Sequence, residues 1–152
     1  MFGRGGYMEK LKVLIAEDDA VSRRLMEASV INWGHEAVCA DDGEQARALL
    51  QAGGIHICIV DWEMPRMNGI ELCQWIRFAH LTPKPYIIML TCRREQEHVH
   101  AAYAAGVHDF ISKPFNRDEL RLRISQVIEE GLPRHGDRRT RRVASSSPTV
   151  NL

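Results

Sequence analysis

Residues 55–61 of this chain read IHICIVD, a largely apolar run that ends in an aspartate. Isoleucine and valine favour extended backbone because their branched side chains pack well on a pleated surface. A strand with apolar residues at successive positions is typical of one buried on both faces. Residues 55–60 therefore predict a strand of a parallel sheet that helices cover on each side.

Strand-like and helical runs alternate outward from this segment along the chain. Strands are expected at residues 11–16, 36–40, 55–60, 86–91 and 108–112. Helices are expected at residues 21–33, through 46–50, at 70–79, at 95–105, and from an Asn116 cap to about 130. Repeated strand–helix units of this kind predict an α/β fold with a doubly wound, five-stranded parallel sheet.

Length and charge favour one domain with no strongly charged partner. The chain has 152 residues, and its 20 Lys and Arg balance its 20 Asp and Glu. A balanced charge creates no global field that would attract nucleic acid or an anionic membrane. Apolar runs such as 55–60 are far too short to cross a bilayer, and the first ten residues lack a signal-peptide pattern. We therefore expect a cytoplasmic location without membrane association.

Composition divides the chain into three segments. Residues 10–131 hold the expected strands and helices, and residues 1–9 form an N-terminal extension. Residues 132–152 are rich in arginine and serine with little to bury, which predicts a disordered tail or linker. A nucleic-acid-binding arm is the alternative for this tail. Four cysteines without a C-x-x-C pair favour reduced thiols over a metal site.

Charged and hydroxyl side chains stand where the expected strands end. They are, in chain order, Glu17, Asp18, Asp19, Asp61, Thr91 and Lys113. Because the carboxyl ends of parallel strands meet at one edge of a sheet, these side chains should converge there. Crowded carboxylates repel by about 4 kcal/mol per pair at roughly 4 Å and an effective dielectric of about 20, and a divalent cation relieves that repulsion. Oxygen ligands beside a phosphoryl group suit Mg²⁺, and a threonine and a lysine suit the phosphoryl oxygens.

Four segments, each at an expected strand end, resemble one known family. VLIAEDD at 13–19 resembles the opening strand and acidic cluster of the receiver domains of two-component response regulators. VDWEMPRMNG at 60–69 resembles the segment around their phosphoacceptor aspartate. IIMLT at 87–91 and AAGVHDFISKPF at 104–115 resemble their fourth and fifth strands. The resemblance covers about residues 10–130 and implies a flavodoxin-like (βα)5 receiver fold.

The resemblance implies a role for each residue of the predicted site. Asp61 would be the phosphoacceptor, Lys113 and Thr91 would bind the phosphoryl group, and Thr91 and Phe110 would form the switch. Mg²⁺, or Mn²⁺ in its place, would be held by Asp18, Asp61, Glu17 through water, and the backbone carbonyl of Glu63. The resemblance also implies a cis peptide bond before Pro114.

The function that the resemblance implies is a phosphorylation-activated signalling switch. A sensor histidine kinase or phosphotransfer protein would supply the phosphoryl group. Phosphorylation would then alter the face formed by helix 95–105, strand 108–112 and the last helix. That face would control a downstream protein or an attached effector domain, with a homodimer as a further option. The resemblance implies a self-phosphorylating, slowly autodephosphorylating protein, not a turnover enzyme, and no direct nucleic-acid binding by the receiver.

Several alternatives to this function and to single roles stand beside it. A receiver-like interaction module that is not regulated by phosphorylation is the main one. An aspartyl phosphatase of the haloacid-dehalogenase kind is disfavoured, because it would carry an aspartate where this chain has Glu63. A nucleotide-binding protein is disfavoured too, because no G-x-G-x-x-G follows the first strand. Asp19 has a simpler interpretation as a helix N-cap, and Phe110 as plain core.

The residues two positions after Asp61 and Thr91 carry opposite charges. They are Glu63 and Arg93, and both should border the mouth of the pocket. Their side chains are long enough to meet across it. The sequence therefore predicts an ion pair that contributes little to stability but stands where water must approach a phosphoryl group.

Overall fold

The computed structural model of the protein describes residues 10–131, which form one five-stranded parallel sheet and five helices. The elements are β1 (Lys12–Ala16), α1 (Ala20–Asn32), β2 (Glu36–Ala40), α2 (Gly43–Gln51), β3 (Ile57–Val60), α3 (Gly69–Phe78), β4 (Tyr86–Thr91), α4 (Gln96–Ala105), β5 (Asp109–Ser112) and α5 (Arg117–Glu130). The predicted α/β, doubly wound parallel sheet is confirmed. The predicted extension 1–9 and tail 132–152 lie outside the described residues, so the domain boundaries stay predictions.

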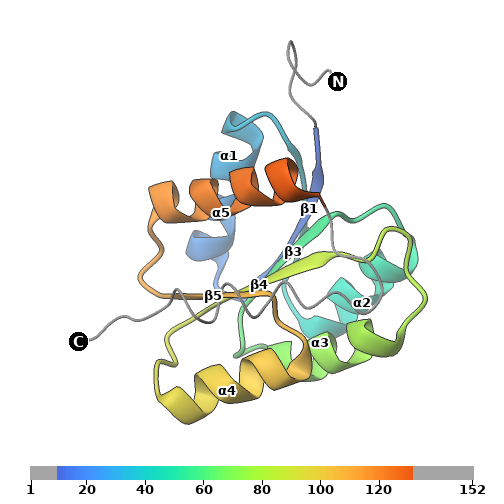
Figure 1. Ribbon diagram of the computed structural model, residues 1–152, viewed down its shortest axis with the longest axis vertical. Coiled ribbons are helices and arrows are strands. Elements are labelled where there is room, and N and C mark those ends of the chain that lie inside the picture. Colours follow the sequence, from blue (N-terminus) through green and yellow to red (C-terminus); the bar gives the residue numbers. More distant parts are fainter. Residues whose placement is uncertain (1–9, 132–152) are drawn as a thin grey trace.

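Helices cover both faces of the sheet. Figure 1 shows α1 and α5 on one face and α2, α3 and α4 on the other. Strand β3 contributes to the cores on both sides, because Ile57 and Ile59 pack with α1 and α5 while Cys58 and Val60 pack in the opposite core. All of β3 is buried. The two-sided burial expected of this segment is therefore confirmed.

The strand order reverses between β1 and β3. The sheet runs β2-β1-β3-β4-β5, so the chain leaves β1 toward one side and returns to β3 on the other. Loops that follow two such strands diverge and leave room for a ligand. The register pairs Ala16 with Val60, so Glu17 and Asp61 come next at the same level. The topology thus brings the two acidic segments together.

Side-chain caps fix where most helices begin. Asp19 accepts a hydrogen bond from the Ser22 amide at 2.9 Å, and Asn116 accepts one from the Glu119 amide at 2.9 Å. Asn68 and Glu71 cap α3 reciprocally. These oxygens satisfy amides that have no partner inside the helix. Asp19 therefore has the simpler of its two interpretations, as the N-cap of α1.

Most predicted bounds agree with the structure to within one residue, but two elements differ further. Strand β3 begins at Ile57 and not at residue 55. Of the apolar residues whose spacing predicts the first helix, Val21, Leu25 and Ile31 are exposed. Helix α1 instead packs on the sheet through Met26 and its neighbours near the C-terminal end. The prediction of a helix was correct, but the face that it buries, with Met26, Ser29 and Val30, is a different one from the predicted apolar stripe.

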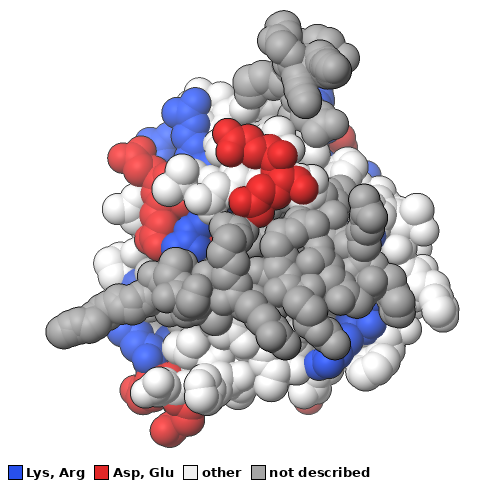
Figure 2. All heavy atoms as spheres, in the orientation of Figure 1, with Lys and Arg blue, Asp and Glu red and all other residues white. Residues whose placement is uncertain are grey.

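The surface carries both signs of charge. In the orientation of Figure 2, Lys, Arg, Asp and Glu side chains are interspersed with uncharged ones, and acidic side chains lie over both ends of α5. This mixture agrees with the zero net charge of the sequence. None of the described helices is long and apolar enough to cross a membrane.

Candidate functional site

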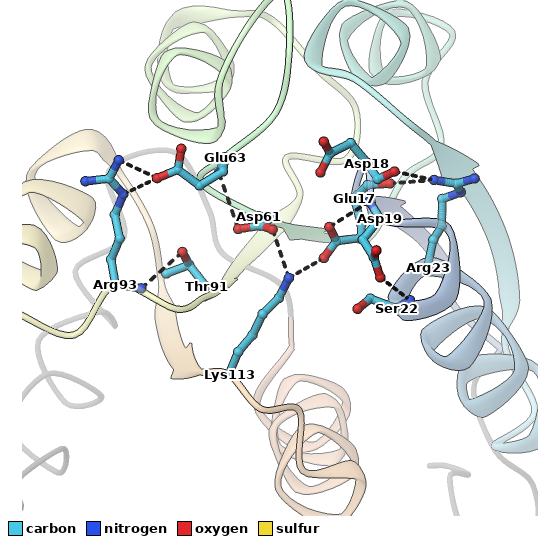
Figure 3. A network of polar contacts seen from close by, with 10 residues as sticks. All are labelled: Glu17, Asp18, Asp19, Ser22, Arg23, Asp61, Glu63, Thr91, Arg93 and Lys113. Atoms are coloured by element: carbon cyan, nitrogen blue, oxygen red, sulfur yellow. Dashed lines mark hydrogen bonds and ion pairs between the residues drawn. The ribbon is translucent and has the colours of Figure 1, made fainter.

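Three carboxylates meet at the carboxyl edge of the sheet. Glu17 and Asp18 follow β1, and Asp61 follows β3. One oxygen from each lies within 4.8 Å of the others. Figure 3 shows them facing a common centre, with Lys113 reaching in from the end of β5. The structure therefore brings together the acidic residues that the sequence placed at separate strand ends.

Lys113 bridges two of these carboxylates. Its Nζ lies 2.7 Å from Glu17 Oε1 and 2.9 Å from Asp61 Oδ2. Burial alone would lower the pKa of Lys113, but the hydrogen bonds to the two carboxylates outweigh it and raise that pKa above its usual value. Lys113 is therefore a fixed cation at the centre of the site.

Glu17 is the most deeply buried acid of the cluster. Only 1% of it is exposed, and its amide donates to the Ala40 carbonyl at 3.0 Å. Burial raises the pKa of Glu17, although the hydrogen bond from Lys113 lowers it in part. A buried carboxylate that shares one ammonium is electrostatically costly, so a further cation at this site would be stabilising.

A close backbone approach shapes the loop after Asp61. The Gly69 amide, at the start of α3, donates to the Trp62 carbonyl at 2.9 Å. A Cβ atom on Gly69 would lie 2.3 Å from the Asp61 carbonyl oxygen. Only glycine allows α3 to begin this close to Asp61. The Asn-Gly that ends the VDWEMPRMNG segment therefore serves as a cap and a close-packing position.

Thr91 lies on β4, next to β3, and Phe110 lies on β5, the edge strand beyond β4. Thr91 is fully buried at the end of β4, and its Oγ1 accepts a long, 3.4 Å hydrogen bond from the Arg93 amide. The Thr91 carbonyl accepts a 2.8 Å hydrogen bond from the Lys113 amide. Phe110, in β5, is half-buried and packs against the core beneath α2, α3 and α4. The packing of Phe110 therefore agrees with its interpretation as a core residue, and its switch role stays a prediction.

The donor set fits a hard divalent cation. Glu17, Asp18 and Asp61 supply only oxygen, and with the Lys113 ammonium they would carry a formal charge of −3 + 1 = −2 when ionised. Oxygen ligands and a double negative charge suit Mg²⁺ or Mn²⁺. The Glu63 amide donates to Asp61 Oδ1 at 3.3 Å, which places the Glu63 peptide beside the cluster. The ligand role of its carbonyl stays a prediction.

The predicted ion pair between Glu63 and Arg93 is present. Two nitrogens of the Arg93 guanidinium contact Glu63 Oε2, as Figure 3 shows. The guanidinium also lies 4.7 Å from the centre of the Trp62 ring and 3.1 Å from His98 Nε2. The ion pair therefore belongs to a larger cluster with Trp62 and His98 at the mouth of the site. The opposite charges of Glu63 and Arg93 did not indicate these two further members.

Buried polar groups on the face of α4, β5 and α5 are incompletely paired. Asp109 forms an ion pair with Arg123, which also contacts Glu119 at 3.3 Å. Among the described residues, the second Asp109 oxygen and the Tyr103 hydroxyl are buried without a hydrogen-bond partner. Burial raises the pKa of Asp109, although Arg123 lowers it in part. Unsatisfied buried groups are rare in folded proteins.

Arg23 is a residue of the site that the sequence did not reveal. Its Nη1 donates to the backbone carbonyl of Glu17 at 2.8 Å and contacts that of Asp18 at 3.4 Å. An arginine one helical turn after an N-cap can reach back to the preceding loop. The spacing between Asp19 and Arg23 could have indicated this contact, but an arginine that faces solvent can stand at the same position in a helix.

The chain is similar to several known proteins. Residues 13–125 match the family described as "Response regulator receiver domain". A chemotaxis protein CheY homolog from Campylobacter jejuni subsp. jejuni is 32% identical over 123 residues, which cover 80% of this chain and 95% of that protein. "Probable transcriptional regulator ycf27" from Porphyridium aerugineum is 32% identical over 121 residues, which cover 80% of this chain but 49% of that protein.

A solved structure shows the same arrangement of elements. The chemotaxis response regulator CheY4 of Vibrio cholerae superposes with a TM-score of 0.73 and 28% identity. The alignment covers 78% of this chain and 99% of that one.

Proposed function

Because the chain belongs to the family of response regulator receiver domains, which are phosphorylation-driven signalling switches and not turnover enzymes, we propose that Asp61 is its phosphoacceptor. The observation that carries the proposal is the meeting of Asp61 with Lys113 at 2.9 Å and with Glu17 and Asp18 in one cluster. Thr91 ends the next strand. An aspartate surrounded in this way is suited to form an acyl phosphate.

The proposed reaction is an in-line phosphoryl transfer. An Asp61 oxygen bonds to phosphorus while the bond from phosphorus to the donor breaks, and the donor's imidazole or acetate departs with the electron pair. Lys113 is placed to neutralise the transferred oxygens. Asp18, Glu17, Asp61 and the Glu63 carbonyl would hold Mg²⁺, which supplies further charge neutralisation on those oxygens. Slow attack of water on the acyl phosphate would reset the protein.

The proposed switch couples this chemistry to the face of α4, β5 and α5. A phosphoryl group on Asp61 would attract the Thr91 hydroxyl, whose present hydrogen bond is long. Movement of Thr91 would free space that Phe110 can fill, and a pre-existing equilibrium would shift.

The proposed partners follow from the phosphoryl chemistry and from the relatives. A sensor histidine kinase or a phosphotransfer protein would donate the phosphoryl group. The relative ycf27 is named a transcriptional regulator, and this chain spans about half of its length. Output through an attached effector domain or a separate protein, or through a homodimer of the α4, β5 and α5 face, is therefore proposed. The receiver itself would not bind nucleic acid.

Phosphorylation by acetyl phosphate tests the proposal. With Mg²⁺, intact-mass analysis should show one added phosphoryl group on the wild type and none on Asp61→Asn. Asp18→Asn should lose Mg²⁺ affinity with its fold intact, and Asp19→Asn is the matched control, since asparagine also caps a helix. Undiminished uptake by Asp61→Asn would refute the assignment of the phosphoacceptor. A wild type that takes up no phosphoryl group would favour the unphosphorylated interaction module.

A further inference from the structure

We infer that Arg23 is a positioning residue that holds the metal-binding acids of the proposed site in place, an inference that rests on the proposed function. Arg23 lies near the start of α1, directly behind the loop that carries Glu17 and Asp18. Its Nη1 donates to the Glu17 carbonyl at 2.8 Å and approaches the Asp18 carbonyl at 3.4 Å. Figure 3 shows the guanidinium on the far side of this loop from Asp61.

The two acids depend on the loop backbone to different degrees. Glu17 is fixed through its side chain, because Oε1 accepts from Lys113 and Oε2 accepts from the Asp19 amide at 3.1 Å. Asp18 is exposed, and its carboxylate has no hydrogen-bond or ion-pair partner within residues 10–131. Only its backbone holds Asp18 toward the cluster. Arg23 contacts the Asp18 carbonyl at 3.4 Å and binds the adjoining Glu17 carbonyl at 2.8 Å, so it contributes to fixing the backbone from which the Asp18 carboxylate projects.

Position and charge predict opposite effects of removing Arg23. The guanidinium is always charged, and a cation beside a Mg²⁺ site repels the metal. If charge dominated, Arg23→Ala would bind Mg²⁺ more tightly than the wild type. If positioning dominates, the same variant would bind more weakly, because groups that orient metal ligands typically contribute about 10–100-fold to affinity. The sign of the change therefore separates the two.

The test is a titration with Mg²⁺ alone, followed by tryptophan fluorescence, with Trp62→Phe identifying the ring that reports. We expect Arg23→Ala to weaken Mg²⁺ binding by about tenfold. Arg24→Ala removes the same charge from the exposed neighbouring residue of α1 and should leave affinity within about twofold. Arg23→Lys, which keeps the charge and a single donor nitrogen, should recover part of the loss. Unchanged or tighter binding by Arg23→Ala would overturn the inference.

A kinetic measurement separates positioning from loss of fold and from failure of the proposed function. For phosphorylation by acetyl phosphate, Arg23→Ala should raise the Mg²⁺ concentration at half-maximal rate, while the rate at saturating Mg²⁺ returns to that of the wild type. A general loss of structure would instead lower both the rate at saturating Mg²⁺ and the melting temperature. That result would overturn the inference. If the wild type itself takes up no phosphoryl group, the proposed function fails, and the Mg²⁺ titration still decides the role of Arg23.

Discussion

Adding a single methyl group at Gly69 should displace the phosphoacceptor. Gly69 is the first residue of α3, where alanine would ordinarily be favourable to the helix by up to about 1 kcal/mol. In this structure the added Cβ would lie 2.3 Å from the Asp61 carbonyl oxygen and 2.9 Å from Trp62 Cα. Both neighbours are backbone atoms, so no side-chain rotation can relieve the contact.

The size of the effect follows from these distances. Ordinary contacts begin at 3.4 Å, so the Asp61 carbonyl and α3 must separate by 3.4 − 2.3 = 1.1 Å. Overpacking of this kind costs about 1–3 kcal/mol, which exceeds the gain in helix propensity. We therefore expect Gly69→Ala to lose about 1–2 kcal/mol of unfolding free energy. A displacement of roughly 1 Å at a reacting group lowers rates by about 100-fold, and we expect that loss in phosphorylation.

The assay is the initial rate of acetyl phosphate-dependent phosphorylation at saturating Mg²⁺, with urea unfolding measured in parallel. Val127→Ala is the matched control, because Val127 is buried in the α1/α5 core on the other face of the sheet. It should lose comparable stability without loss of rate. Equal rates for Gly69→Ala and Val127→Ala would refute the reasoning, since stability alone would then explain both. A Gly69→Ala variant as stable as the wild type would show that the loop yields without cost.

Two further predictions concern kinetics and pH. Glu63→Ala and Arg93→Ala should each speed decay of the acyl phosphate, by at most about fivefold because exposed ion pairs contribute up to about 1 kcal/mol. The double variant should be no faster than either, and unchanged decay in both would leave the pair as ordinary surface charges. His35 Nδ1 accepts a 3.1 Å hydrogen bond from the Leu11 amide, and burial lowers the pKa of His35 from 6.5. The unfolded chain therefore binds the proton first, and stability should fall as pH drops below 6.5, by at most about 1.4 kcal/mol per pH unit. His35→Asn should flatten this pH dependence, whereas His80→Asn, at an exposed position, should not. Equal slopes of unfolding free energy against pH in the two variants would contradict the prediction.

The sequence was most informative where a local pattern meets a rule of topology. Ile57 to Val60 is apolar at every position, and only a strand between two helical layers satisfies that pattern. Parallel strands then carry Asp61, Thr91 and Lys113 to one edge whatever the loops do. The cis peptide bond between Lys113 and Pro114, implied by the resemblance, is also present. The convergence of Asp61, Thr91 and Lys113 follows from the common direction of the parallel strands, so the position of each residue directly after its strand was enough to predict it.

Contacts that depend on which segment faces which could not be predicted. His35, His56 and His108 each precede a strand, and each Nδ1 accepts a hydrogen bond from an amide in the neighbouring strand or, for His35, directly before it. Nothing in a lone histidine before a strand indicates that role, because the donor lies more than 20 residues away in sequence. The cis bond between Thr82 and Pro83 was likewise not expected. Long-range pairing of single side chains requires the folded backbone.

The hydrogen bonds of Thr91 indicate which part of the proposed switch is able to move. A protein-bound phosphate carries roughly two negative charges, and Lys113 already serves both Glu17 and Asp61. A phosphoryl group on Asp61 therefore needs another donor, and within residues 10–131 the Thr91 hydroxyl is bound only through a 3.4 Å contact with the Arg93 amide. The Thr91 carbonyl, in contrast, is tied to the Lys113 amide at 2.8 Å. Rotation of the side chain and movement of the loop at Arg93 break the weak bond and keep the strong one, so the signal should leave through the β4–α4 loop while β4 stays in the sheet.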